Sequence, residues 1–274
     1  MVLADRHGPP VAIVRACLRD GRGGSPTAVM DDAPLSDDER RRVPELMGTS
    51  HAVFVSARDD GPVSLRFFTS AGELPACGHG TVAALAFLAE RTGAAAFRAT
   101  LHTAGRVFAG RAVREKSRFH ATFDPGPVDL REPTDAERDL VLPALGVPGG
   151  TPARVASVGP ERLLVPVPTR SVLSALAPDL VRLRAACDRL GLLGCYVYSA
   201  PTPAGRLAAR MFAPSIGVPE DIANANGTAC LAAHLSRDIA VDMGDSLGSP
   251  STITAAHGTP IHVGGAAKVT VRPP

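Results

Sequence analysis

The chain has 274 residues, of which 45% are hydrophobic and 20% are charged, a composition typical of one large or two modest globular domains and not of a disordered chain. The 29 basic and 27 acidic residues nearly balance, which excludes the concentrated basic surface of a nucleic-acid-binding protein. No run reaches the roughly 18 apolar residues of a transmembrane helix.

The N-terminal segment and the cysteines indicate the compartment. Residues 1–10 carry Asp5 and Arg6 and contain no apolar signal core, so we expect a cytoplasmic protein. The five cysteines are odd in number and form no Cys-x-x-Cys pair. This pattern favours reduced thiols and no zinc site.

In the first half, short apolar runs alternate with turn residues. They predict strands over residues 11–18, 27–30, 52–57, 63–69, 98–103, 106–113 and 120–123. Ser36 and Glu39 form a capping-box pair that predicts a helix over 36–47. A second helix is predicted over 80–91. It has no charged residue up to Leu88 and must be covered on all sides.

The second half has the same rhythm. Strands are predicted over residues 155–158, 162–167, 195–199, 207–212, 251–256, 260–263 and 267–271. A helical stretch is predicted from 172 to 176, and an alanine-rich helix from 227 to 235. The proline-rich segment 124–133 is the natural linker between the halves.

An internal echo relates the halves. The sequence RFF at 66–68 leads through a loop to CGHGT at 77–81 and an apolar helix, and RMF at 210–212 leads through a loop to ANGT at 225–228 and another such helix. We therefore predict two related halves. The first covers residues 1–123, joined by the final strand 263–274, and the second covers residues 124–262.

Two enclosed helices side by side would place two helix N-termini at a common cleft. Each N-terminus offers unpaired backbone N–H groups and a partial positive charge. Because the chain lacks a basic surface, these groups are expected to hold the substrate, a small carboxylate. The residues expected to bind it are Gly78, Gly80, Thr81, Asn226, Gly227 and Thr228.

His79 lies between two glycines at the start of the first buried helix. There the helix dipole should keep its imidazole neutral, and it either donates a hydrogen bond or a proton to substrate or caps its own helix. Cys77 is interpreted as structural, because residues 222–228 contain no partner thiol for a two-thiol racemase. Asp221 either relays a proton across the cleft or bonds nearby backbone amides.

Several short segments stand out, spread in order over nearly the whole chain: GSPTAV at 24–29, RFFT at 66–69 with Glu73, CGHGT at 77–81, PED at 219–221, GSPS at 248–251 and VGG at 263–265. In these segments the chain resembles the phenazine-biosynthesis PhzF-like family of the diaminopimelate-epimerase-like fold. The resemblance implies an α+β fold of two pseudo-symmetric halves, each a barrel-like sheet around a central helix. It also implies a homodimer and no cofactor or metal.

The resemblance also implies roles for individual residues. The family histidine and aspartate match His79 and Asp221, and Asn226 stands where a serine is usual. The position of the family's catalytic glutamate holds His51. An imidazole keeps acid–base capacity near neutral pH, so the catalytic residues are expected to be His51, His79 and Asp221.

The expected function is cofactor-independent isomerisation: a proton transfer shifts a double bond in a small unsaturated carboxylic acid of secondary metabolism. One such acid is a pyrroline carboxylate of the 4-alkyl-proline branch that supplies lincosamides and pyrrolobenzodiazepines. The alternatives are an epimerase or racemase of an amino-acid derivative, and a non-catalytic carboxylate-binding protein. Neither a nucleic acid nor a membrane is expected as a partner.

Overall fold

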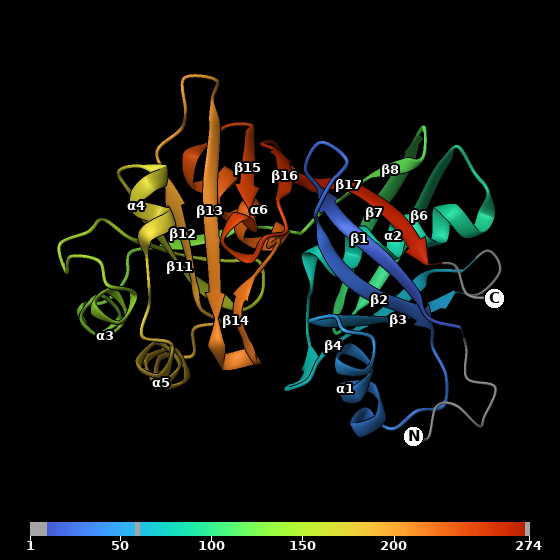
Figure 1. The fold of residues 1–274 in the computed structure, drawn as a ribbon, viewed down its shortest axis with the longest axis horizontal. Helices are drawn as coiled ribbons and strands as arrows, with labels where there is room; N and C mark the ends of the chain where they lie inside the picture. Colours follow the sequence, from blue (N-terminus) through green and yellow to red (C-terminus); the bar gives the residue numbers. More distant parts are fainter. Residues whose placement is uncertain (1–9, 58–60, 272–274) are drawn as a thin grey trace.

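A fully enclosed helix lies at the centre of the N-terminal half. This helix, α2 (Gly78–Thr92), is buried from Gly78 to Ala89, as its lack of a polar face requires. The computed structural model describes residues 10–57 and 61–271, and α2 runs inside a strongly curved sheet (Figure 1).

The strands around α2 form a closed ring in which each strand hydrogen-bonds to the next. In order around the ring they are β1 (Ala12–Leu18), β2 (Ser25–Asp31), β3 (His51–Ala57), β4 (Val63–Thr69), β6 (Ala96–Thr103), β7 (Arg106–Glu115), β8 (Arg118–Phe123) and β17 (His262–Val271), which returns to β1. A short strand, β5 (Gly72–Leu74), pairs with β4. Helix α1 (Asp37–Leu46) packs outside the ring and has the predicted capping box of Ser36 and Glu39.

The C-terminal half repeats this plan around α6 (Ala225–Leu235), which is buried from Ala225 to Ala232. Its strands follow in hydrogen-bonded order: β9 (Asp129–Arg131), β10 (Arg154–Ser157), β11 (Glu161–Val167), β12 (Cys195–Ser199), β13 (Arg206–Ala213), β15 (Ile239–Met243) and β16 (Ser251–Ala256). Strand β14 (Val218–Asp221) pairs with β13, and 3-10 turns span Pro214–Ile216 and Asp245–Leu247.

The echo in the sequence corresponds to a repeated structural unit. In both halves a strand is followed by a short antiparallel partner, the central helix and a parallel strand: β4–β5–α2–β6 and β13–β14–α6–β15. The first pair of strands is joined in each unit by an arginine–glutamate pair, Arg66 with Glu73 at 2.6 Å and Arg210 with Glu220 at 2.7 Å. The predicted α+β fold with two similar halves is confirmed.

Strand β17 belongs to both sheets. Its beginning pairs with β16 in the register Ala256↔His262, while its end pairs with β1 in the register Ile13↔Val271. Between these ends it also pairs with β8. In Figure 1 this red strand passes from one half of the molecule to the other. Residues 1–9 and 272–274 of the predicted N-terminal half lie outside the described residues.

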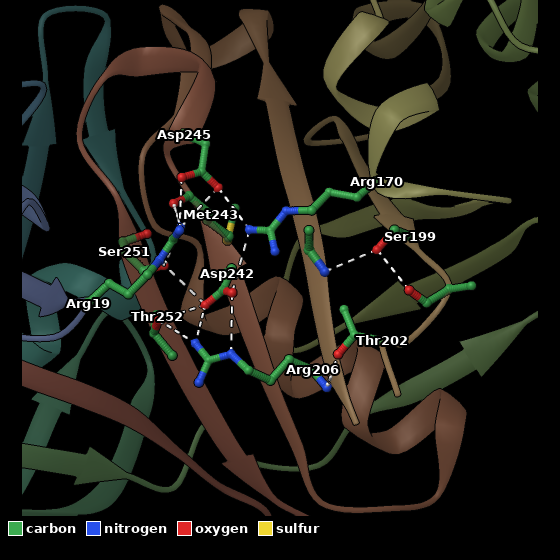
Figure 2. Close-up of polar contacts among 12 residues, drawn as sticks. Arg19, Arg170, Ser199, Thr202, Arg206, Asp242, Met243, Asp245, Ser251 and Thr252 are labelled. Atoms are coloured by element: carbon green, nitrogen blue, oxygen red, sulfur yellow. Dashed lines mark hydrogen bonds and ion pairs between the residues drawn. The ribbon is translucent and has the colours of Figure 1, made fainter. Parts of the chain in front are cut away.

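An ion-pair network also joins the halves (Figure 2). Arg19, which follows β1, bonds Asp245 at 2.8 Å and the carbonyl oxygens of Met243 and Ser251. Asp242 is buried and accepts bonds from Arg206 and Thr252. Although burial raises the pKa of the Asp242 carboxyl, these donors hold it below its usual value. The network fixes the end of β1 to the β15–β16 connection.

The sequence prediction missed two helices and four strands. Helices α3 (Asp135–Leu145) and α5 (Leu180–Leu190) pack together on the outer face of the C-terminal sheet (Figure 1). They cover a hydrophobic cluster that includes Leu163 and Val165 of β11. The short helix α4 (Arg170–Ala175) packs on β11, β12 and β13. Pro143 lies inside α3 and obscures its helical pattern. The missed strands are β5, β9, β14 and β15, and β9 lies within the segment 124–133 that was predicted to be a linker. No helix in the described part of the chain combines the length and the apolar character that crossing a membrane requires.

Candidate active site

The two central helices meet at their N-termini. A methyl group placed on Gly78 of α2 would lie 2.7 Å from Cβ of Ala225 and 3.0 Å from the backbone nitrogen of Asn226 in α6. The N-caps are Cys77 and Asn224, so both helices begin two residues earlier than predicted. His79 and Asn226 therefore occupy equivalent positions in the first turns.

The N-termini differ in whether a side chain caps them. The side chain of Asn224 accepts the backbone N–H of Gly227 at 2.7 Å, which satisfies a donor of α6. Cys77 makes no capping hydrogen bond. The first turn of α2 thus keeps N–H groups free to bind an anion.

A cleft opens where the helices meet, and both halves contribute to its lining. The polar side chains that line it are His51, Cys77 and His79 from the first half, and Arg162, Asp221, Asn224 and Asn226 from the second. The structure thus brings together the three predicted catalytic residues, with Gly78 and Asn226 also in the lining. Figure 1 shows α2 and α6 in their separate halves on either side of this junction.

The other predicted binding residues lie behind the cleft lining, against protein atoms. Thr81 and Thr228 each donate a hydroxyl hydrogen bond to the carbonyl oxygen of their own N-cap residue. A Cβ on Gly80 would approach Phe67 at 3.1 Å, and one on Gly227 would approach the ring of Tyr196 at 2.4 Å. Their small or hydroxyl side chains let the helix ends pack inside the sheets.

His51 and His79 stand edge to face, with ring centroids 4.3 Å apart. His51 begins β3, and its Nδ1 is 2.9 Å from the Ser50 hydroxyl. This contact leaves Nε2 of His51 for the cleft. His79 is held from the second half, because its Nδ1 lies 2.8 Å from the carbonyl oxygen of Ala223 and so carries the proton.

Asp221 bonds a nearby backbone amide, which is one of its two expected roles, and it also lies close to His79. Its carboxylate accepts the backbone N–H of Ala223 at 3.3 Å and the side-chain amide of Asn224 at 3.0 Å. One carboxylate oxygen also lies 3.8 Å from Nδ1 of His79. A buried carboxylate at this distance favours the charged form of the imidazole.

The pKa values of the two histidines move in opposite directions. Burial and the neighbouring His79 hold the pKa of His51 well below its usual value. Burial also acts to lower the pKa of His79, but the Cys77 sulfur and the Asp221 carboxylate outweigh it and raise the pKa to about 10. The expectation that the helix dipole keeps His79 neutral was therefore wrong. A neutral base beside a charged acid is an arrangement suited to proton transfer.

His51, Cys77 and His79 could contact one metal ion. The ligand atoms of His51, Cys77 and His79 all lie within 4.8 Å of one another, and the Sγ of Cys77 is 3.6 Å from Nε2 of His79. Imidazole and thiolate are ordinary zinc ligands. Sequence spacing did not indicate this cluster, because β3 brings His51 to the others only in the folded chain.

The sequence prediction missed two polar residues of the cleft, Arg162 and Asn224. Arg162 is only 1% exposed, and its Nη1 donates to the side-chain oxygen of Asn224 at 3.3 Å. A signal was present: Arg162 stands two residues before Leu164 on β11, so both point to the same face. Leu164 belongs to the core around α6, and a charged residue on that face is unusual.

Comparison with known proteins agrees with this picture. The family described as phenazine biosynthesis-like protein matches residues 18–272. The chain is 32% identical over 259 residues to a trans-2,3-dihydro-3-hydroxyanthranilate isomerase of Pseudomonas aeruginosa, which covers 89% of this chain and 88% of the relative. It is 29% identical over 216 residues to an uncharacterized isomerase of Escherichia coli, over 75% of this chain and 72% of the relative.

Solved structures show the same fold. A protein of Pseudomonas aeruginosa described as a predicted epimerase superposes with a TM-score of 0.83 at 26% identity, over 96% of this chain and 98% of the other. A hydroxyproline epimerase of Agrobacterium vitis has a TM-score of 0.67 at 13% identity, over 96% and 89% of the two chains, and shares the architecture. The paired helix N-termini, the cleft histidines and these matches lead to one assignment. The chain belongs to the family of phenazine biosynthesis-like proteins.

Proposed function

We propose that the chain is a cofactor-independent isomerase that moves a double bond in a small unsaturated carboxylic acid. The observation that carries this proposal is the pair of cleft histidines with rings 4.3 Å apart and oppositely shifted pKa values. Its relatives are named isomerases. The substrate carboxylate would bind at the uncapped N-terminus of α2.

The proposed reaction conserves protons and involves no redox change. Neutral His51 removes a proton from one carbon as that C–H bond breaks, and the double bond shifts. Protonated His79 gives a proton to a second carbon, where a C–H bond forms. Transfer of the acquired proton from His51 to His79 then restores both groups. Asp221 stabilises the charged form of His79 through the 3.8 Å contact.

His51 in place of the family glutamate supports a substrate other than trans-2,3-dihydro-3-hydroxyanthranilate. An imidazole differs from a carboxylate in charge and reach, and a neutral base suits an anionic substrate without added repulsion. We infer that the substrate is a pyrroline carboxylate of secondary metabolism, of the 4-alkyl-proline type. By the same family resemblance we infer that the protein is a homodimer and is located in the cytoplasm. Light scattering of the purified chain would test the dimer.

The competing reaction is epimerisation, which the fold also supports in other proteins. Cys77 lies in the cleft as the N-cap of α2 and could serve as one thiol base. The equivalent residue of α6 is Asn224, which cannot act as the second. The geometry therefore favours isomerisation by the histidines.

Incubation in deuterium oxide separates the candidate functions. Unsaturated pyrroline carboxylates and trans-2,3-dihydro-3-hydroxyanthranilate would be followed by proton NMR. Carbon-bound deuterium with a displaced double bond supports the isomerase. Deuterium at an existing stereocentre with inversion indicates an epimerase, and saturable binding without exchange indicates a binding protein.

A His51→Ala variant tests the assignment of the base. We expect exchange to fall by about 100-fold or more, since positioned general bases contribute about that much. His257→Ala is the matched control, because His257 is exposed and lies outside the cleft lining. Full activity of His51→Ala on the substrate would refute the role of His51.

A further inference from the structure

Arg162 is a buried cation that has no acidic partner among the residues the structure describes. Arg162 and Arg40 are the two buried arginines in the described part of the chain. Arg40 pairs with Asp32 at 2.9 Å and with Asp37 at 3.2 Å. Among the described residues, no carboxylate oxygen lies within 4.0 Å of the Arg162 guanidinium. Burying a charge without a counter-charge is costly, and proteins rarely retain such a group without a use for it.

Few of the donors on Arg162 are used. Nη1 donates to the side-chain oxygen of Asn224 at 3.3 Å, and Nη2 donates to the carbonyl oxygen of Pro160 at 3.2 Å. Nε is buried without a partner. Arg40 also has an unpartnered Nε, so the feature that distinguishes Arg162 is the absence of an acid. The guanidinium lines the cleft, where its planar set of donors suits a carboxylate.

The acid in the cleft does not supply the missing charge. Asp221 lies 3.8 Å from His79 and reaches Arg162 only through the amide of Asn224, which donates to Asp221 at 3.0 Å. Asp221 is thus associated with His79, and no carboxylate of the described residues is left to pair with Arg162. A ligand carrying one negative charge would balance the site.

We propose that Arg162 is the ionic partner of the substrate carboxylate and makes the cleft selective for singly charged acids. This inference rests on the proposed function for the identity of the ligand as a substrate. It changes the expectation that helix N-termini alone hold the carboxylate. In the ligand-free protein Arg162 is retained at a cost in stability, and the bound acid removes that cost.

The ligand-free test is a comparison of thermal unfolding. Arg162→Met replaces the cation by an apolar side chain of similar length, and we expect the melting temperature to rise. Arg40→Met is the matched control and should lower it, because Asp32 loses its cationic partner and Asp37 keeps only Arg66. A fall in the melting temperature of Arg162→Met like that of Arg40→Met would assign Arg162 a structural role and overturn the proposal.

The binding test uses two probes of one shape, pyrrole-2-carboxylate and its neutral amide, in titration calorimetry. The wild-type protein should bind the acid about tenfold or more tightly than the amide. Arg162→Met should lower this preference by weakening binding of the acid more than binding of the amide, while Arg162→Lys should recover part of it. The absence of a preference in the wild-type protein, or an undiminished preference in Arg162→Met, would refute the inference.

These outcomes are distinct from those of the deuterium experiment. If exchange requires His51 but carboxylate binding does not depend on Arg162, the proposed isomerase function is supported and the inference about Arg162 fails. If carboxylate binding requires Arg162 but no acid is isomerised, the inference stands as a binding property and the proposed function fails.

Discussion

The contact between the two central helices can be tested with one methyl group. In a Gly78→Ala variant, the new Cβ would lie 2.7 Å from Cβ of Ala225. Carbon atoms in favourable contact are about 3.5–4.0 Å apart. The helix ends must therefore separate by about 1 Å. The new methyl group cannot move aside instead, because the backbone nitrogen of Asn226 lies 3.0 Å from it and both helices are enclosed by their sheets.

The expected cost follows from overpacking. A methyl group forced into a packed site destabilises a protein by about 1–3 kcal/mol. For a chain of this size each kcal/mol corresponds to about 2–4 °C in the melting temperature, so we expect a fall of roughly 2–12 °C. Separation of the helix ends by about 1 Å should also lower the exchange rate by about 100-fold, because His79 and the carboxylate site move relative to Asp221.

The assay combines thermal unfolding with deuterium exchange on the substrate. Gly149→Ala is the matched control, because a Cβ on the exposed Gly149 meets nothing within 4 Å, and it should behave as wild type. A Gly78→Ala protein with wild-type stability and wild-type exchange would show that the helix N-termini are not in close contact, and the cleft described here would be wrong.

Three further predictions concern the charged groups. The folded pKa of His51 lies below its unfolded value, so the stability that comes from burying neutral His51 should be present above pH 6.5 and decline as pH falls. The folded pKa of His79 is raised, so its contribution to stability should be present below pH 6.5 and decline as pH rises toward about 10. When the free energy of unfolding is measured against pH, His51→Asn should remove the decline at acid pH and His79→Asn the decline at alkaline pH. Declines that stay unchanged in these variants would contradict the directions of the pKa shifts. Arg19→Ala should lower the free energy of unfolding by about 1–3 kcal/mol through loss of charged hydrogen bonds to Asp245, whereas an unchanged melting temperature would show that the network does not join the halves. Removal of metals with EDTA should leave exchange unchanged, and loss of exchange restored by Zn²⁺ would instead give the histidine–cysteine cluster a metal.

The elements that the sequence predicts well are those with a local signal. The capping box at Ser36 and the uncharged segment after Gly80 depend on neighbours within a few residues, and both predicted helices are present. Arg66 and Arg210 occupy equivalent positions in the two halves, and each belongs to the structural unit that both halves share. Helix α3 was missed although Thr134 and Glu137 form a capping box of the same kind.

The site was harder to predict because its chemistry depends on contacts between distant segments. Position in the sequence indicates His79 at a helix N-terminus, where the dipole disfavours charge. The pKa of His79 is raised instead by Cys77, two residues earlier, and by Asp221, 142 residues later in the chain and 3.8 Å away. Arg162 has no motif around it, and its meaning comes from a missing partner that only the folded structure reveals.

Strand β17 has a consequence for how the protein is made. During synthesis, β1 and β8 leave the ribosome more than 130 residues before β17, which fills the gap between them. Until then the nascent N-terminal sheet has two open edges beside an apolar helix, and open edges invite pairing with other chains. Completion of the first barrel must therefore wait for the last strand, so slow elongation through the second half should favour aggregation or capture by chaperones.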